Sequence, residues 1–267
     1  TLDDVADFFR QFYAPNNAAI AIVGDFDYDE ALAMIERHFA DIAPSPQPIV
    51  LPDISEPRQE AEKRASRLDP LAPRPGFAFA YHVPERLTPE WYAMGLLDQV
   101  LLQGEDSLLT QKLVKEEGIT SGVSGGINAL LGNMLNYRGP MLWTASLIHD
   151  NDVDEEQIVA ALDSVIESVR TEAIDAATLE RAKVKWRSQF YNDVSATYGF
   201  GRADLLASLA LYDDDPESLN RFEAEFMDVT PELMLRTAQE YLRPTNRTIL
   251  VLEAGAAQQG QEVANNE

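Results

Sequence analysis

The sequence predicts an α+β fold in which helices cover one mostly antiparallel sheet. Two observations carry this prediction. The apolar periodicity changes along the chain from a strand to helices, then to two strands, several helices and a last strand. In addition, one helix-turn-strand unit occurs twice, near the start and near the end. The composition permits such a fold, because 45% of the 267 residues are hydrophobic, enough for one large or two modest cores.

The repeated unit begins with a threonine, continues with a helical stretch and ends in a proline, an asparagine and an apolar run. Corresponding residues lie 229 positions apart without a gap: Thr1 and Thr230, Phe12 and Tyr241, Pro15 and Pro244, Asn17 and Asn246, Ile20 and Ile249. Threonine can cap a helix, proline ends one, and asparagine suits the turn that follows. The apolar run is typical of a strand covered on both faces.

This repeat has two interpretations. Helix-turn-strand units are common, so a short match can arise by chance. Alternatively, two related domains each close with this unit. The second copy then follows a full domain, whereas nothing precedes the first copy, so we expect the chain to begin at the tail of a domain whose front is missing.

Residues 1–42 are expected to form a helix, the strand 18–23 and a second helix that Asp27 caps. Residues 43–75 hold eight prolines in a polar stretch, which predicts a semi-extended linker. Residues 76–253 are predicted to form a complete second domain. Its strands are expected near 77–83, 119–129, 140–149 and 248–252, and its helices near 88–102, 107–116, 154–171, 176–196, 200–212, 216–227 and 231–242. Residues 254–267 are polar and predicted to be disordered.

Charge and composition exclude several classes of protein. The net charge of -24, from 45 acidic and 21 basic residues, argues against binding to nucleic acid or an anionic membrane. The absence of cysteine excludes disulfides, zinc fingers and cysteine nucleophiles. No apolar stretch approaches the roughly 20 residues of a membrane-spanning helix. The compartment stays open between the bacterial periplasm and the cytoplasm.

No motif within the chain predicts a catalytic or metal-binding centre. The three histidines, His38, His82 and His149, lack a second ligand at metal-binding spacing. The glycines of residues 122–126 lie in a predicted strand, so a phosphate-binding loop is not indicated. They fit either the close approach of another backbone or a bulged strand. A site assembled from distant parts of the chain stays open.

Several segments, in order, resemble the insulinase/pitrilysin family of zinc peptidases, which includes mitochondrial processing peptidase. The resemblance covers nearly all of residues 2–252. The matching segments are 12–18, 23–27, 38–39, 113–119, 215–216, 229–232 and 241–248. It implies two homologous α+β domains, with an inverted His-x-x-Glu-His zinc motif and a further glutamate in the first.

No residue of this chain matches those zinc ligands. The resemblance therefore implies the end of domain one and all of domain two, with zinc held by a missing N-terminal domain and no cofactor in this chain. In active relatives the second domain supplies an arginine and a tyrosine that hold substrate. The matching positions are Val114 and Ser121, neither of which carries the charged donor group of that arginine. They are the candidate substrate-chamber residues, and no catalytic or metal-binding residue is assigned.

Three functions follow as alternatives. In the first, the parent is a zinc metallopeptidase that hydrolyses peptides in a chamber between paired domains, and this portion, inactive alone, supports the chamber and substrate binding. In the second, the chain is a non-catalytic scaffold or a partner subunit of a homo- or hetero-oligomer. In the third, it is a free-standing binding module. A truncated first domain should also expose Ile20, Ile22 and Leu32, so we expect self-association or a mobile N-terminal segment.

Overall fold

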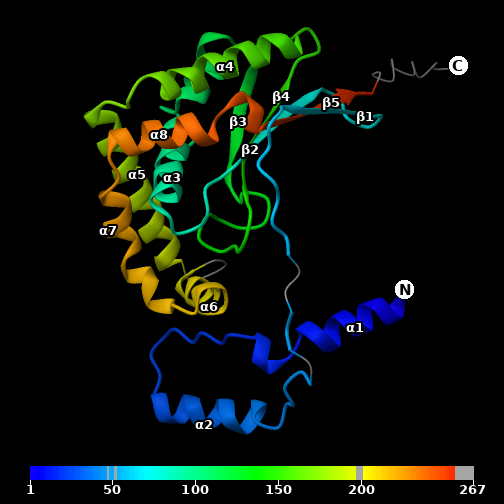
Figure 1. Ribbon diagram of the computed structural model, residues 1–267, viewed down its shortest axis with the longest axis vertical. Coiled ribbons are helices and arrows are strands. Elements are labelled where there is room, and N and C mark those ends of the chain that lie inside the picture. Colours follow the sequence, from blue (N-terminus) through cyan, green and yellow to red (C-terminus); the bar gives the residue numbers. More distant parts are fainter. Residues whose placement is uncertain (47, 51–52, 197–200, 256–267) are drawn as a thin grey trace, which may run out of the picture. The chain divides into compact units, whose positions relative to one another are not determined.

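The computed structural model describes residues 1–46, 48–50, 53–196 and 201–255 (Figure 1). It divides into two compact units. Unit 1 comprises Thr1–Ser55, Leu135–Arg138 and Arg187–Glu223, and unit 2 comprises Glu56–Met134, Gly139–Trp186 and Ala224–Glu267. This division differs from the predicted domains, because residues 187–223 group with the N-terminal segment.

Unit 2 is built on one mixed five-stranded sheet with the order β1-β5-β2-β4-β3. Its strands are β1 (Lys63–Asp69), β2 (Gly76–His82), β3 (Thr120–Ile127), β4 (Leu142–His149) and β5 (Arg247–Ala254). The β1–β5 pair is parallel, and the other three pairs are antiparallel. The predicted α+β class with a mostly antiparallel sheet is therefore confirmed.

The described residues also form the following helices. They are α1 (Leu2–Phe12), α2 (Tyr28–Phe39), α3 (Pro89–Leu101), α4 (Glu155–Thr171), α5 (Ala176–Ser195), α6 (Arg202–Asp213), α7 (Phe222–Met227) and α8 (Pro231–Tyr241). Short 3-10 turns are η1 (Pro15–Asn17), η3 (Pro216–Asn220) and η4 (Pro244–Asn246), and η2 (Thr110–Glu116) is a π-helix. A π-helix is rare and occurs frequently at functional sites.

One face of the sheet is buried beneath helices, and the other is left more open. Successive side chains of a strand point to opposite faces. On β2 and β4 the buried set is aromatic and aliphatic: Phe77, Phe79, Tyr81, Trp143, Ala145 and Leu147. Helix α3 is buried along nearly its whole length and packs against α8, which also contacts α4. The core of unit 2 therefore lies on the helical side of the sheet, seen in Figure 1.

The opposite face carries small and polar side chains together with exposed aliphatic ones, among them Leu142, Ile148 and Leu250. In cross-strand order, one row runs through Ala65, Leu250, Ala78, Ser146 and Ser124. Ser124, Ser146 and Leu250 are exposed, whereas Ala78 is partly exposed. This face, which we call the open face, has no helix of unit 2 packed on it among the described residues.

The two copies of the repeated unit begin in the same way. The Thr1 hydroxyl accepts a hydrogen bond from the backbone N–H of Asp4 at 3.3 Å and caps α1. The Thr230 hydroxyl accepts from the N–H of Leu233 at 3.2 Å and caps α8. Each cap satisfies a backbone donor that the helix itself leaves unpaired.

Both copies also end in the same way. The amide nitrogen of Asn17 donates to the carbonyl of Phe12 at 2.9 Å, and that of Asn246 donates to the carbonyl of Tyr241 at 2.6 Å. Asn246 makes one further bond, to the carbonyl of His82 at the end of β2, at 3.1 Å. The repeat is therefore one local structure, and the second copy is in addition tied to a sheet.

The prediction of a strand over residues 18–23 is wrong, because the structure has no strand there. These residues follow η1, as β5 follows η4, but they pair with no strand among the described residues. Their counterpart β5 is a strand because β1 and β2 lie on its two sides. Ile20, Ile22 and Leu32 are substantially exposed, as expected.

The predicted linker is wrong for residues 63–69, which form β1. Sequence periodicity misses this edge strand because almost all of its residues are exposed and polar. Ionic contacts hold it to β5: the buried Arg247 donates to Glu62 at 2.6 Å and also pairs with Asp163 of α4.

Strand β5 ends at Ala254, one residue beyond the predicted domain. Most of the tail that was predicted to be disordered lies outside the described residues.

Replacing Asn246 with alanine should lower the free energy of unfolding by about 2–3 kcal/mol, because it leaves two carbonyls without their donor. The matched change Asn17→Ala removes one bond at a more exposed site and should cost less than about 1 kcal/mol. Urea denaturation followed by tryptophan fluorescence measures the loss at Asn246, since Trp91, Trp143 and Trp186 lie in unit 2 with it, and far-UV circular dichroism follows the helices of unit 1 for Asn17→Ala. Equal losses in the two variants would contradict the role given to the His82 contact.

Candidate functional site

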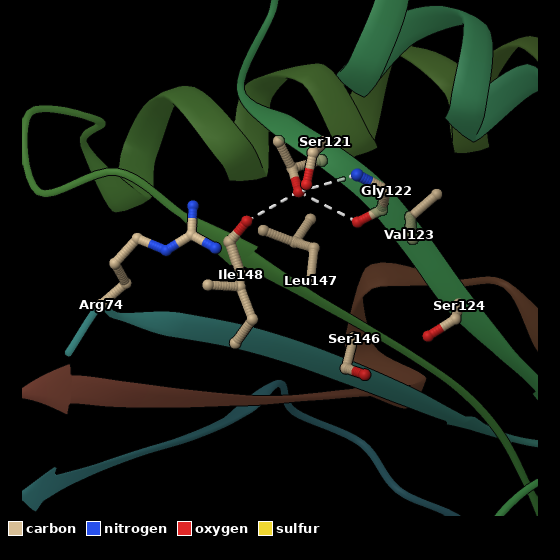
Figure 2. A pocket seen from close by; sticks show the side chains of 9 residues that line it. Arg74, Ser121, Gly122, Val123, Ser124, Ser146, Leu147 and Ile148 are labelled. Carbon is tan, nitrogen blue, oxygen red and sulfur yellow. Dashed lines mark hydrogen bonds between the residues drawn. The ribbon is translucent and has the colours of Figure 1, made fainter. Parts of the chain in front are cut away.

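A pocket of about 370 Å³ lies where β3 and β4 meet the loop that precedes β2 (Figure 2). Its lining combines one cation, four hydroxyl groups and small or aliphatic residues: Arg74, Thr120, Ser121, Gly122, Val123, Ser124, Ser146, Leu147 and Ile148. Ser121, a candidate from the sequence, is among them. No acidic side chain lines the pocket, although the chain carries 45 acidic residues.

An irregularity in β3 shapes this pocket. The pairing of β3 with β4 shifts register between Thr120 and Val123. The buried Thr120 hydroxyl lies 2.7 Å from the carbonyl of Ile148 and 2.9 Å from that of Gly122, and it accepts from the Gly122 N–H at 3.2 Å. A bulge of this kind re-aims neighbouring side chains. Ser121 therefore lines the pocket from a locally distorted strand.

The polar groups of the pocket are available to a ligand. The hydroxyls of Ser121, Ser124 and Ser146 make no hydrogen bond within the part of the chain that the structure describes. Arg74 contacts Asp150 only through one nitrogen at 3.4 Å, and both side chains are more than half exposed. Such a surface pair contributes little. Figure 2 shows Arg74 at one end of the pocket and Ser124 at the other.

Val114, the second candidate, lies on the π-helix η2, which packs against β3. It is half-buried and does not line the pocket. The structure thus puts the two candidates on neighbouring elements but only Ser121 in the pocket. Arg74 was missed by sequence reasoning, because a single arginine between two prolines carries no motif.

A buried carboxylate fixes the far end of β3. Asp98 of α3 accepts from the indole N–H of Trp143 at 2.7 Å and from the amide of Gln103 at 3.0 Å. The same Gln103 nitrogen lies 3.2 Å from the carbonyl of Gly125. Asp98 therefore joins α3, β4 and β3, and it is a positioning residue for the strand that lines the pocket.

Gly125 explains why this strand is rich in glycine. A Cβ atom there would lie 2.0 Å from the carbonyl oxygen of Thr144 and 2.7 Å from the Cα of Ala145. No side chain fits, so the backbone of β4 approaches at this point. Of the two interpretations of residues 122–126, close backbone approach holds at Gly125, and the strand is irregular near Gly122.

Burial raises the pKa of Asp98 to about 6, although the hydrogen bonds from Trp143 and Gln103 and the charge of Lys185 act in the opposite direction. The Lys185 ammonium donates to the carbonyls of Gln99 at 3.0 Å and Gln103 at 2.6 Å, and to Asp106 at 2.8 Å. A cation at the C-terminal end of α3 stabilises the helix. It also holds in place the loop that carries Gln103.

The histidines do not form a centre. His149 is buried, with Nδ1 2.9 Å from the carbonyl of Asp150, and His82 lies 3.6 Å from Glu56. In the described ranges no three His, Asp or Glu side chains are grouped so that they could hold a metal ion. Within those ranges, too, every helix is too short or too polar to cross a membrane.

Comparison with known proteins identifies similarities in sequence and in fold. Residues 1–185 match the family described as peptidase M16 inactive domain. The zinc protease PqqE of Helicobacter pylori is 24% identical over 255 residues, which are 95% of this chain and 55% of that protein. The chain thus spans just over half the length of the curated relative that it matches.

Two solved structures show the same fold. A protease from Helicobacter pylori superposes with a TM-score of 0.82 at 21% identity, over 95% of this chain and 59% of that chain. A peptidase M16 inactive domain from Pseudomonas fluorescens gives a TM-score of 0.74 at 20% identity, over 97% of this chain and 58% of that one.

Asp98→Asn should remove a pH dependence of stability. The folded chain holds the Asp98 proton more tightly than the unfolded chain does, so this group makes stability fall as the pH rises from about 4 to about 6. The difference from the ordinary pKa of 3.8 corresponds to roughly 3 kcal/mol. From pH 4 to pH 7, the free energy of unfolding of the Asp98→Asn variant should therefore rise by about that much relative to that of the unchanged chain. Urea denaturation at both pH values measures the difference, and a constant difference would contradict the burial of the charge.

Proposed function

We propose that this chain, which belongs to the peptidase M16 family, is the portion of a zinc-dependent peptidase that does not bind the metal. The family match confirms the resemblance to the insulinase/pitrilysin zinc peptidases. In this role its sheet forms part of the wall of a chamber, and peptides bind against the open face. The observation that carries the proposal is the pocket on that face. There one cation and three unbonded serine hydroxyls lie beside Gly122 and aliphatic side chains, around a volume of about 370 Å³.

The physical case rests on the two faces of the sheet. The helical face is filled by large buried side chains, among them Phe77, Phe79 and Trp143. The open face presents Ser124, Ser146 and Gly122 in the pocket, and small residues such as Ala65 and Ala78 along neighbouring strands. An extended peptide is recognised mainly through its backbone, which such a surface can approach closely. Binding without cleavage is the expected activity of the chain alone.

Zinc belongs to the parent protein in this proposal. The described residues offer no set of ligands that fits the ion, so no step of the reaction is assigned to a metal on this chain. The similar PqqE protein is named a zinc protease, and 55% of its length is covered here. We place the metal-binding motif in a domain that precedes Thr1 in the parent.

The repeated unit supports this arrangement of domains. The Phe8 side chain on α1 is 53% exposed, whereas its counterpart on α8, Thr237, is 1% exposed within the helical layer of unit 2. Val5 and Phe9 are likewise half exposed. Residues 1–42 then close a first domain, and the rest of that domain supplies the helices that cover α1 and the strand that pairs with residues 18–23.

The second candidate function is a non-catalytic scaffold or partner subunit. Val114 and Ser121 favour it, because neither supplies the charged or phenolic donor that active relatives carry at these positions. The two functions differ in the residues that precede Thr1. An intact His-x-x-Glu-His motif there supports the peptidase, and its loss supports the scaffold.

The parent protein should cleave a broad peptide library and lose that activity when a chelator removes its metal. The chain of 267 residues should bind the same peptides without cleaving them. Mass spectrometry of the library and fluorescence anisotropy with labelled peptides measure the two properties. A zinc-loaded parent without hydrolytic activity would contradict the peptidase and leave the scaffold function.

Phe8→Asp should destabilise the parent by about 3 kcal/mol or more, because it puts a charge where the first domain buries an aromatic ring. In the present chain the same change should cost less than about 1 kcal/mol, since Phe8 is half exposed. Leu2→Asp, at the exposed start of α1, is the matched control and should change neither protein by more than about 0.5 kcal/mol. Thermal denaturation of the six proteins measures the effects. A similar loss for Phe8→Asp in both backgrounds would contradict the proposed first domain.

A further inference from the structure

The pocket on the open face is chemically matched to an anion. Arg74 is its one charged lining residue, and its contact with Asp150 is a single one at 3.4 Å. Arginine presents several N–H donors in a planar fork that fits the two oxygens of a carboxylate. The chain has a net charge of -24, so most of its surface repels an anionic ligand. Arg74, with donors to spare, attracts such a ligand to this pocket.

The serines of the lining add hydrogen-bond donors on small side chains. The hydroxyls of Ser121, Ser124 and Ser146 have no partner within the described part of the chain, and each can donate to an oxygen. Thr120 is already bonded to the carbonyl of Ile148 and does not compete. Asp98 and Gln103 hold the far end of β3, so the strand that carries two of these serines is fixed before a ligand arrives.

We propose that this pocket binds the C-terminal carboxylate of a peptide that lies on the open face. Arg74, at one end of the pocket, is the counter-ion of the carboxylate, and Ser121 is a further donor. Ser124 and Ser146, toward the other end, can bond to backbone groups of the same peptide. The inference rests on the proposed function, because it takes the ligand to be a peptide. The inference specifies the class of ligand: peptides with a free C-terminus rather than internal segments of long chains.

The open space beside Gly122 favours a terminal carboxylate over an acidic side chain. A terminal carboxylate is attached directly to the peptide backbone, so the backbone itself must come close to the strands. Gly122 permits this approach, since a Cβ atom there would meet nothing within 4 Å and the space stands open. A glutamate side chain, which reaches a cation through its methylene groups, needs no such approach.

The test compares one labelled peptide in two forms, with a free C-terminal carboxylate and with a C-terminal amide. Fluorescence anisotropy on the chain of 267 residues should show at least about tenfold tighter binding of the free acid. Arg74→Gln should remove this preference, and Arg74→Lys should keep part of it. The matched control Arg64→Gln removes the same charge from β1, where Arg64 is paired with Glu62 and Glu155, and should keep the preference.

Gly122→Val fills the open space and provides a steric test. It should weaken binding of the free acid at least about tenfold while leaving the circular dichroism spectrum unchanged, because no atom lies near the added group. A third peptide, amidated at its terminus but with a glutamate as last residue, separates the two sources of carboxylate. It should bind like the plain amide.

Each outcome decides the proposal. Equal binding of acid and amide, a preference that survives Arg74→Gln, or full affinity of the glutamate-bearing amide would overturn the terminal-carboxylate site and leave the proposed function standing. Absence of binding by all three peptides would instead contradict peptide binding on the open face, and with it both proposals.

Discussion

The structure of unit 2 depends on the burial of one face of its sheet. Aromatic side chains of β2 and β4, among them Phe77, Phe79 and Trp143, are enclosed by helices, and α3 lies within that layer. Burying such rings is the largest favourable contribution that a domain of this size can make. Because the aromatic side chains of the sheet lie on one side, the opposite face has no helix of unit 2 packed on it within the described residues and carries serines and alanines beside a few exposed aliphatic side chains. The asymmetry that stabilises the fold therefore also creates the surface offered to a ligand.

Polar groups inside the core set the details of that surface. Asp98 links α3 to β4 through Trp143 and to β3 through Gln103. Arg247 performs a similar task at the other side of the sheet, where it joins Glu62 to Asp163. Buried charges of this kind cost free energy to desolvate and are retained where they fix one arrangement. Here they fix the strands that border the pocket and the segment that enters β1.

Much of this fold was predictable from particular residues, and some of it was not. The repeat was visible because Thr1, Asn17, Thr230 and Asn246 act through local chemistry, capping a helix or closing a turn a few residues away. Strand β1 was hidden, since its stability comes from backbone pairing with β5 and from the ion pair of Arg247, which lies 184 residues beyond the start of β1. Arg74 was hidden for the same reason, because only the folded sheet brings it to β3 and β4. Ser121 was found through family resemblance, and its surroundings emerged only from the bulge.

Amide hydrogen exchange, measured with and without a saturating peptide, tests most directly whether the open face receives the ligand. Exchange should slow in residues 120–124 and 146–148, which line the pocket, while the helices behind the sheet keep their rates. The contradicting result is bound peptide with unchanged exchange in these two segments, or protection confined to the helical layer.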